Sequence, residues 1–138
     1  GDARRNGLAL ATGHGSPEES LVAIREARAA GIDRIVATHP TSGLVGMSVA
    51  IQKEEARMGA LLEYTISGGR GAVTELAAQI REVGPGNVVL TSDLGQSGNP
   101  LPADGFRWMV ARLEEAGLTP AEIDVMTKRN PARFLGLD

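Results

Sequence analysis

Four short apolar runs, each ending in a threonine, recur at nearly constant spacing along the chain. The closing threonines, Thr12, Thr38, Thr65 and Thr91, are 26, 27 and 26 residues apart. The runs read LALAT (8–12), RIVAT (34–38), LLEYT (61–65) and NVVLT (87–91), and each has the length and aliphatic character of a buried strand. Amphipathic segments separate them, so the sequence predicts right-handed strand–helix–strand units and a parallel sheet. This period is typical of successive units of a (β/α)8 barrel.

Start and stop signals define the helices between these runs. Ser16 is the expected N-cap of the first helix, with Pro17 at N1 and Gly31 just past its end. Thr119, followed by proline and by Glu122 at N3, forms an expected capping box. The expected helices cover 17–30, 48–58, 72–83 and 105–116, followed by a last helical stretch after Thr119.

Composition limits the class of protein and its partners. With 138 residues, 42% hydrophobic and 22% charged, the chain is expected to form a single α/β domain over residues 1–138. A net charge of −3 gives no basic patch for nucleic acid or anionic membrane, and no apolar run approaches the roughly 18 residues of a membrane span. The absence of cysteine excludes disulfides, a thiolate zinc site and a cysteine nucleophile. It also fits a cytoplasmic location, which we expect.

Side chains able to do chemistry follow three of the four runs. The first run is followed by His14, the second by His39 and the fourth by Asp93. His14 and His39 are the only two histidines of the chain. Because the carboxyl ends of parallel strands form the active-site face of such folds, we expect these side chains to share one edge. Two imidazoles and a carboxylate suit a divalent metal, zinc first, with manganese or iron as alternatives. Asp93 is then a metal ligand, a proton acceptor for water, or both.

Each of these residues also has a structural interpretation. A single histidine at a strand end is commonly a loop residue, and Asp93 has the residue type of a helix N-cap. The loop after Asp93, LGQSGNPLPAD, is long, which favours a substrate-side loop in which Gln96 and Asn99 contact substrate. Glu63 has a weaker claim, because it lies within a strand, where a buried ion pair is the structural alternative.

A glycine-rich stretch follows the third run. SGGRGAV (67–73) opens a helix, so its backbone N–H groups and Arg70 could hold a phosphate or carboxylate of a substrate. The structural alternative is a loop whose glycines only satisfy a turn.

The motifs TGHGSPEESL, VATHP, VVLTSDLGQ and NPARFLGL together resemble the amidohydrolase superfamily of metal-dependent hydrolases. Members of that superfamily are (β/α)8 barrels whose metal ligands include histidines ending strands five and six and an aspartate ending strand eight. The resemblance therefore implies that His14, His39 and Asp93 are metal ligands, and that His39 and Asp93 are the catalytic residues. It also implies that the third run is strand seven, without a ligand, and that Asn130, Pro131 and Arg133 of the closing helix are structural.

The family pattern also has a His-x-His pair on strand one, and no histidine precedes residue 14 here. The chain is therefore expected to be the C-terminal half of a barrel, a sheet with two open edges. Its expected partners are a small-molecule substrate and either the missing N-terminal half or a second copy of the chain. The expected function is hydrolysis of an amide, ester or related bond by metal-activated water. The alternative is a non-catalytic half-barrel that acts as a binding or assembly module without metal.

Overall fold

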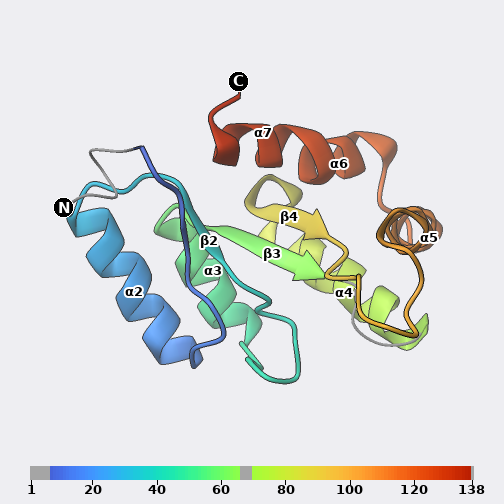
Figure 1. Ribbon diagram of the computed structural model, residues 1–138, viewed down its shortest axis with the longest axis horizontal. Helices are drawn as coiled ribbons and strands as arrows, with labels where there is room; N and C mark the ends of the chain where they lie inside the picture. The colour runs from blue at the N-terminus through green and yellow to red at the C-terminus, as the bar shows by residue number, and fades with distance from the viewer. Residues whose placement is uncertain (1–6, 66–69, 138) are drawn as a thin grey trace.

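The computed structural model describes residues 7–65 and 70–137, except the side chains of residues 70–72. Four parallel strands form one sheet in the order β1-β2-β3-β4, which is also their order along the chain (Figure 1). The strands are β1 (Leu10–Ala11), β2 (Ile35–Ala37), β3 (Leu61–Thr65) and β4 (Val88–Thr91). The predicted α/β class and the parallel sheet are thus confirmed.

The first strand is shorter than its apolar run predicts. Only Leu10 and Ala11 pair in register with β2, opposite Ile35 and Val36. Within the described residues β1 pairs on one side only, and the backbone bond from Thr12 N to Val36 O, 3.0 Å long, extends that pairing by one residue. An apolar run read from sequence does not distinguish an edge strand, whose pairing ends early, from a central one.

The helices alternate with the strands, as predicted. They are α2 (Pro17–Ala29), α3 (Val49–Arg57), α4 (Arg70–Val83), α5 (Pro102–Glu115), α6 (Pro120–Asp124) and α7 (Asn130–Leu135). A short 3-10 helix, η1 (Pro85–Asn87), leads into β4, and a π-helical segment, η2 (Val125–Arg129), joins α6 to α7. Among the described residues, no helix has the length and apolar character needed to cross a bilayer.

The predicted helix starts are correct where a side chain caps the helix. Ser16 caps α2 and Thr119 caps α6, each with a complete capping box. The expected start of the fourth helix at residue 105 is wrong, because α5 begins at Pro102, where proline suits the N1 position. Asp93 therefore lies well before that helix and does not cap it.

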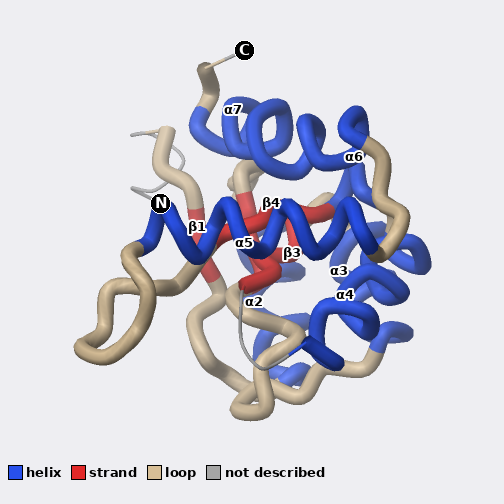
Figure 2. Tube along the Cα trace, turned by 90° about the vertical axis from the view of Figure 1, so that its right-hand side faces the viewer, coloured by secondary structure: helices blue, strands red, loops and turns tan. Residues whose placement is uncertain are grey.

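The sheet separates two layers of helices. Because strand order follows chain order, right-handed crossovers place α2, α3 and α4 on the same face. Figure 1 shows these helices on one side of the strands and α6 and α7 on the other. Figure 2 shows α5 lying across the end of this arrangement, in front of the strands.

The main core lies between the sheet and α2–α5. Its fully or almost fully buried members include Ile24, Leu62, Tyr64, Ile80 and Leu113. The Tyr64 hydroxyl donates to Gln52 Oε1, and Gln52 Nε2 in turn donates to the Met47 carbonyl at 2.9 Å. Burial raises the pKa of Tyr64 and keeps this hydroxyl a donor.

The opposite face of the sheet has an apolar part and a polar part along the direction of the strands. Where the strands begin, Val36, Leu61 and Val89 pack against Phe134 of α7. Since side chains alternate along a strand, Glu63 and Thr91 share this face two residues further on. The face is thus apolar where the strands begin and polar where they end, and it is the polar end that holds the candidate site.

Asn130 fixes α7 against the start of β4. It is 4% exposed, and its amide nitrogen donates to the carbonyls of Pro85 and Val88 at 2.9 and 2.7 Å. This gives Asn130 the structural position expected from the sequence.

Candidate functional site

Four polar side chains from four successive strand–helix units meet at the carboxyl edge of the sheet. His14 follows β1, His39 follows β2, Glu63 lies within β3, and Asp93 follows β4. The ring centroids of His14 and His39 are 5.1 Å apart. Parallel strands in sequential order therefore bring together residues that are up to 79 positions apart in the chain.

The His39 imidazole lies between two carboxylates. Its Nδ1 atom is 3.4 Å from Glu63 Oε2, and its Nε2 atom is 3.8 Å from Asp93 Oδ2. The His39 side chain is 13% exposed, that of Glu63 22%, and that of Asp93 56%. The site thus runs from a half-buried carboxylate, through a largely buried imidazole, to a carboxylate open to solvent.

The Glu63 carboxylate is held by its own neighbour. Thr91 Oγ1 donates to Glu63 Oε1 at 3.1 Å, which leaves Oε2 for His39. Within the described residues, the buried His39 Nδ1 atom makes no hydrogen bond of good geometry. A buried ring nitrogen without a partner is costly, so a small movement of either side chain to complete the Nδ1–Glu63 bond is favourable.

His39 and Asp93 share an uncommon backbone conformation. Both have φ of +48°, and among the described residues they are the only non-glycine residues with positive φ. The left-handed region is disfavoured for residues with a Cβ, typically by about 1 kcal/mol or more. Such strain gathers at functional sites, where a side chain must point in a direction that ordinary backbone does not give it.

Threonine side chains fix the loop that carries His14. Thr12 Oγ1 accepts from the Thr38 N–H at 3.0 Å, and Thr38 Oγ1 accepts from the Gly13 N–H at 3.1 Å. This reciprocal pair continues the β1–β2 contact past the last ladder bond. It fixes the backbone next to His14, while the His14 side chain itself is exposed.

The predicted substrate-side residues lie in different settings. Gln96 Nε2 donates to the Asp93 carbonyl at 2.7 Å, and Asn99 Nδ2 donates to Gln96 Oε1 at 2.8 Å. Both side chains are exposed on the loop that carries Asp93, which they brace. Arg70 is the first residue of α4, and its side chain lies outside the described residues, as does most of the glycine-rich stretch.

His14, His39 and Asp93 have the donor chemistry for a divalent metal, and the structure brings them to one edge. As they stand, the described residues contain no group of three or more His, Asp or Glu side chains placed to hold a metal ion. Of the three predicted ligands, His39 and Asp93 form a pair, with His39 Nε2 3.8 Å from Asp93 Oδ2. The third predicted donor, His14, is exposed, and its ring centroid is 5.1 Å from that of His39.

Two residues of the site were undervalued or missed from sequence. From sequence alone, Glu63 has a weaker claim than the two histidines and Asp93, and Thr91 is expected only as the end of a strand. The alternation of side chains along a strand could have identified both residues. Every second residue of a strand lies on the same face of the sheet, so Glu63 and Thr91 can face each other from neighbouring strands. With Thr65 opposite Thr91 in register, Glu63 and Thr91 are close diagonal neighbours on that face.

Comparison with protein families gives one match, and it covers less than half of the chain. A model described as a family of unknown function (DUF6282) matches residues 3–63. This segment includes His14, His39 and Glu63 and ends before Asp93. The search of curated proteins and the search of solved structures gave no match. The resemblance to amidohydrolases therefore stays a prediction.

Proposed function

We propose that this chain is a metal-dependent hydrolase of the amidohydrolase type, and that its sheet is half of a TIM-type barrel. The sequential parallel order supports the barrel, and so does the placement of α2, α3 and α4, the helices that connect the strands, on one face. In doubly wound sheets the connecting helices lie on both faces. The site at the carboxyl ends of the strands supports the enzyme, since this is the catalytic face of such barrels. The substrate class is a small molecule with an amide, ester or related bond.

One observation carries the proposal. A largely buried imidazole stands between two carboxylates, on a backbone held in the left-handed region at both His39 and Asp93. A structural histidine needs neither a second carboxylate nor a strained backbone. Both features suit an imidazole that must present Nε2 in one fixed direction.

In this proposal His14, His39 and Asp93 hold a divalent metal, zinc first, with manganese or iron as alternatives. When bound, the metal would lower the pKa of water toward about 7 and polarise the bond to be broken. Glu63 accepts a hydrogen bond from the Nδ1–H group of His39, and this leaves the Nε2 lone pair free to bind the metal. Asp93, exposed beside His39, accepts the proton that attacking water gives up. Gln96 and Asn99 brace the Asp93 loop, and Arg70 is proposed to bind the substrate.

The test is metal content per chain, measured on purified protein after reconstitution with zinc and removal of excess metal. We expect close to one zinc per chain in the wild type and a large loss in His14→Ala and His39→Ala. Asp33→Asn is the matched control, because Asp33 is exposed and lies at the other end of the sheet. Equal metal content in wild type and both histidine variants would contradict the proposed site.

Asp93→Asn separates catalysis from folding. Its carboxylate is 56% exposed and contacts only His39 among the described ion pairs, so we expect a small change in melting temperature. Hydrolysis of ester and amide model substrates by the zinc-loaded protein should fall by about a hundredfold or more, as for loss of a positioned proton acceptor. A marked loss of folding would instead show that Asp93 is structural.

A second candidate is a non-catalytic half-barrel that acts as a binding or assembly module. The observation that favours it is the absence, among described residues, of three donors already placed around one point. A folded wild-type chain that takes up no zinc, manganese or iron would support this candidate over the hydrolase.

A further inference from the structure

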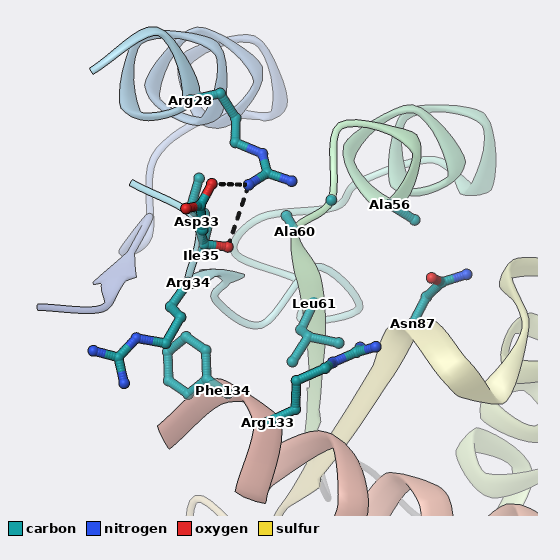
Figure 3. A pocket seen from close by; sticks show the side chains of 11 residues that line it. Arg28, Asp33, Arg34, Ile35, Ala56, Ala60, Leu61, Asn87, Arg133 and Phe134 are labelled. Atoms are coloured by element: carbon teal, nitrogen blue, oxygen red, sulfur yellow. Dashed lines mark hydrogen bonds and ion pairs between the residues drawn. The ribbon is translucent and has the colours of Figure 1, made fainter. Parts of the chain in front are cut away.

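A pocket of about 340 Å³ lies at the end of the sheet opposite the candidate site. It opens where β2 and β3 begin, and its walls come from α2, α3 and α7 (Figure 3). This pocket is not part of the proposed hydrolase site. The structural role expected for the closing helix does not require it either.

The lining of this pocket is positively charged. Three guanidinium groups, those of Arg28, Arg34 and Arg133, face a single carboxylate, Asp33. Arg28 Nη1 pairs with Asp33 Oδ1 at 3.0 Å. Neither Arg34 nor Arg133 forms an ion pair with any carboxylate of the described residues. In a chain with 17 acidic and 14 basic residues, this is a local excess of positive charge.

Backbone carbonyls hold the three arginines in place. Arg28 Nε donates to the Met58 carbonyl at 2.7 Å, Arg34 Nη2 donates to the Gly7 carbonyl, and Arg133 Nη2 donates to the Gly86 carbonyl at 3.1 Å. A carbonyl orients a guanidinium without neutralising it. Among the described residues, the remaining N–H groups of Arg34 and Arg133 have no carboxylate partner, so they can bind an anion at low cost in side-chain entropy.

Two glycines make room for these guanidinium groups. A Cβ at Gly59 would lie 1.9 Å from Arg28 Nη2, and one at Gly136 would lie 2.8 Å from Arg34 Nη1. Both glycines have positive φ, +87° and +71°. Any other residue at Gly59 would displace the Arg28 guanidinium from the pocket wall.

An aromatic ring also lines this pocket. In the view of Figure 3, Leu61 and the Phe134 ring lie between the guanidinium groups of Arg34 and Arg133. Leu61 is only 6% exposed and is already covered by its neighbours, whereas Phe134 is partly exposed. A ligand that covers the Phe134 ring needs an apolar body as well as a negative charge, since an inorganic anion alone would leave the ring in contact with water.

We propose that this pocket binds a small organic anion with a carboxylate or phosphate head and an apolar body. The head contacts the guanidinium groups at the rim, and the body covers the partly exposed Phe134 ring. Because the pocket lies at the opposite end of the strands, the ligand is distinct from the substrate of the proposed hydrolase.

The test uses phenyl phosphate and benzoate as probes, with benzyl alcohol and inorganic phosphate as partial mimics, in calorimetric titrations. We expect an aromatic anion to bind several-fold more tightly than inorganic phosphate, and benzyl alcohol to bind too weakly to measure. Arg133→Met should weaken the aromatic anion by about tenfold, the order expected for one charge-assisted contact. The control Arg107→Met, an exposed arginine of α5, should leave affinity unchanged. The tighter of the two anions identifies the head group.

The location is tested by amide chemical shifts on adding the tighter probe. The amides of Ala60, Leu61 and Asn87 should move, both in the wild type and in His39→Ala. Undetectable binding, equal binding by Arg133→Met, or shifts confined to residues near His39 would overturn the proposal. Binding that survives in His39→Ala also separates this site from the hydrolase, whose failure would leave it intact.

Discussion

The imidazole of His39 shows how one residue can be set by its neighbours. Glu63 faces its Nδ1 atom and Asp93 its Nε2 atom, so the two nitrogens have unlike surroundings, one buried and one near solvent. Thr91 fixes the first carboxylate from the adjacent strand. The arrangement favours the tautomer that carries its proton on Nδ1, since the half-buried Glu63 carboxylate is the nearer acceptor.

Glu63→Gln should change that tautomer. In the metal-free wild type at pH 8, the ¹⁵N shifts of His39 should report a proton on Nδ1. Because a side-chain amide either donates or accepts, we expect mixed tautomers in the variant. Zinc affinity should fall by about 10- to 100-fold, as for loss of a carboxylate that orients a metal-binding histidine.

The matched control is Glu18→Gln, at an exposed position in the first turn of α2. Unchanged His39 shifts in Glu63→Gln would contradict the orienting role. Because the tautomer is measured without metal, this outcome is independent of whether the proposed hydrolase site takes up zinc.

At the scale of single residues, the sequence predicted which side chains lie together at the edge of the sheet. It did not predict the backbone conformations and hydrogen bonds that position them. His14, His39 and Asp93 could be placed at one edge, because each follows a strand of a regular repeat. The left-handed backbone of His39 and the bond from Thr91 to Glu63 depend on contacts between strands. No local pattern of residues encodes those contacts.

At the scale of helices and strands, some helix ends are set by neighbouring residues in the sequence and others by contacts with distant parts of the chain. Ser16 and Thr119 could be predicted as caps because a cap acts locally. Each hydroxyl accepts a hydrogen bond from the backbone N–H three residues further on. The π-helical segment η2 was not predicted, since the closing stretch reads as one helix. It ends at Arg129, just before Asn130, whose bonds to Pro85 and Val88 span more than 40 residues.

Asn130→Ala should weaken the docking of α7. The substitution leaves two carbonyls near the start of β4 without their donor, at a cost of about 1–3 kcal/mol in the free energy of unfolding. Urea unfolding measures this cost. Asn99→Ala, which removes a bond on an exposed loop, is the control and should cost less than about 0.5 kcal/mol. Equal losses in the two variants would show that the Asn130 bonds contribute nothing specific.

The contact of α3 with α2 contains a buried acid, Glu55. This side chain is 0% exposed, and neither carboxylate oxygen makes a complete hydrogen bond within the described residues. Burial raises the pKa of Glu55; the Ser20 hydroxyl partly offsets this, and the Glu54 carboxylate adds to it. The folded state therefore favours the protonated form.

Stability should accordingly depend on pH through Glu55. Its contribution is fully present below the ordinary glutamate pKa of about 4.3, and it is lost as pH rises through the raised pKa of the folded state. Glu55→Gln, which cannot ionise, should raise the melting temperature by a few degrees at pH 8 and leave it nearly unchanged at pH 4. Calorimetry at both values tests this, and an equal shift at both would contradict it.

For the whole molecule, the regular spacing of the four apolar runs predicted the parallel sheet. It did not predict what pairs with the two edge strands. β1 and β4 end the sheet, each pairing with one neighbour among the described residues. The N–H groups of Leu10 and Thr12 bond to β2, so by alternation that of Ala11 points toward the open edge. A second copy of the chain or a complementary half-barrel would pair there.

Self-association is therefore expected to rise with concentration and to involve this edge. Light scattering during size-exclusion chromatography should give a mass that increases across the micromolar range. Ala11→Pro removes the outward donor without removing a bond to β2, and should shift the mass toward a single chain. A single-chain mass at every concentration would contradict pairing between copies.

The positive φ values of His39 and Asp93 also bear on how such a protein evolves. Glycine, and asparagine to a lesser degree, fits the left-handed region with less strain than histidine does. At these two positions, mutation toward glycine would relax the backbone while removing the chemistry. Without selection on the site, genetic drift would therefore favour a chain that is more stable but has lost the site's chemistry. Relatives that keep histidine and aspartate at these positions are those in which the site is still under selection.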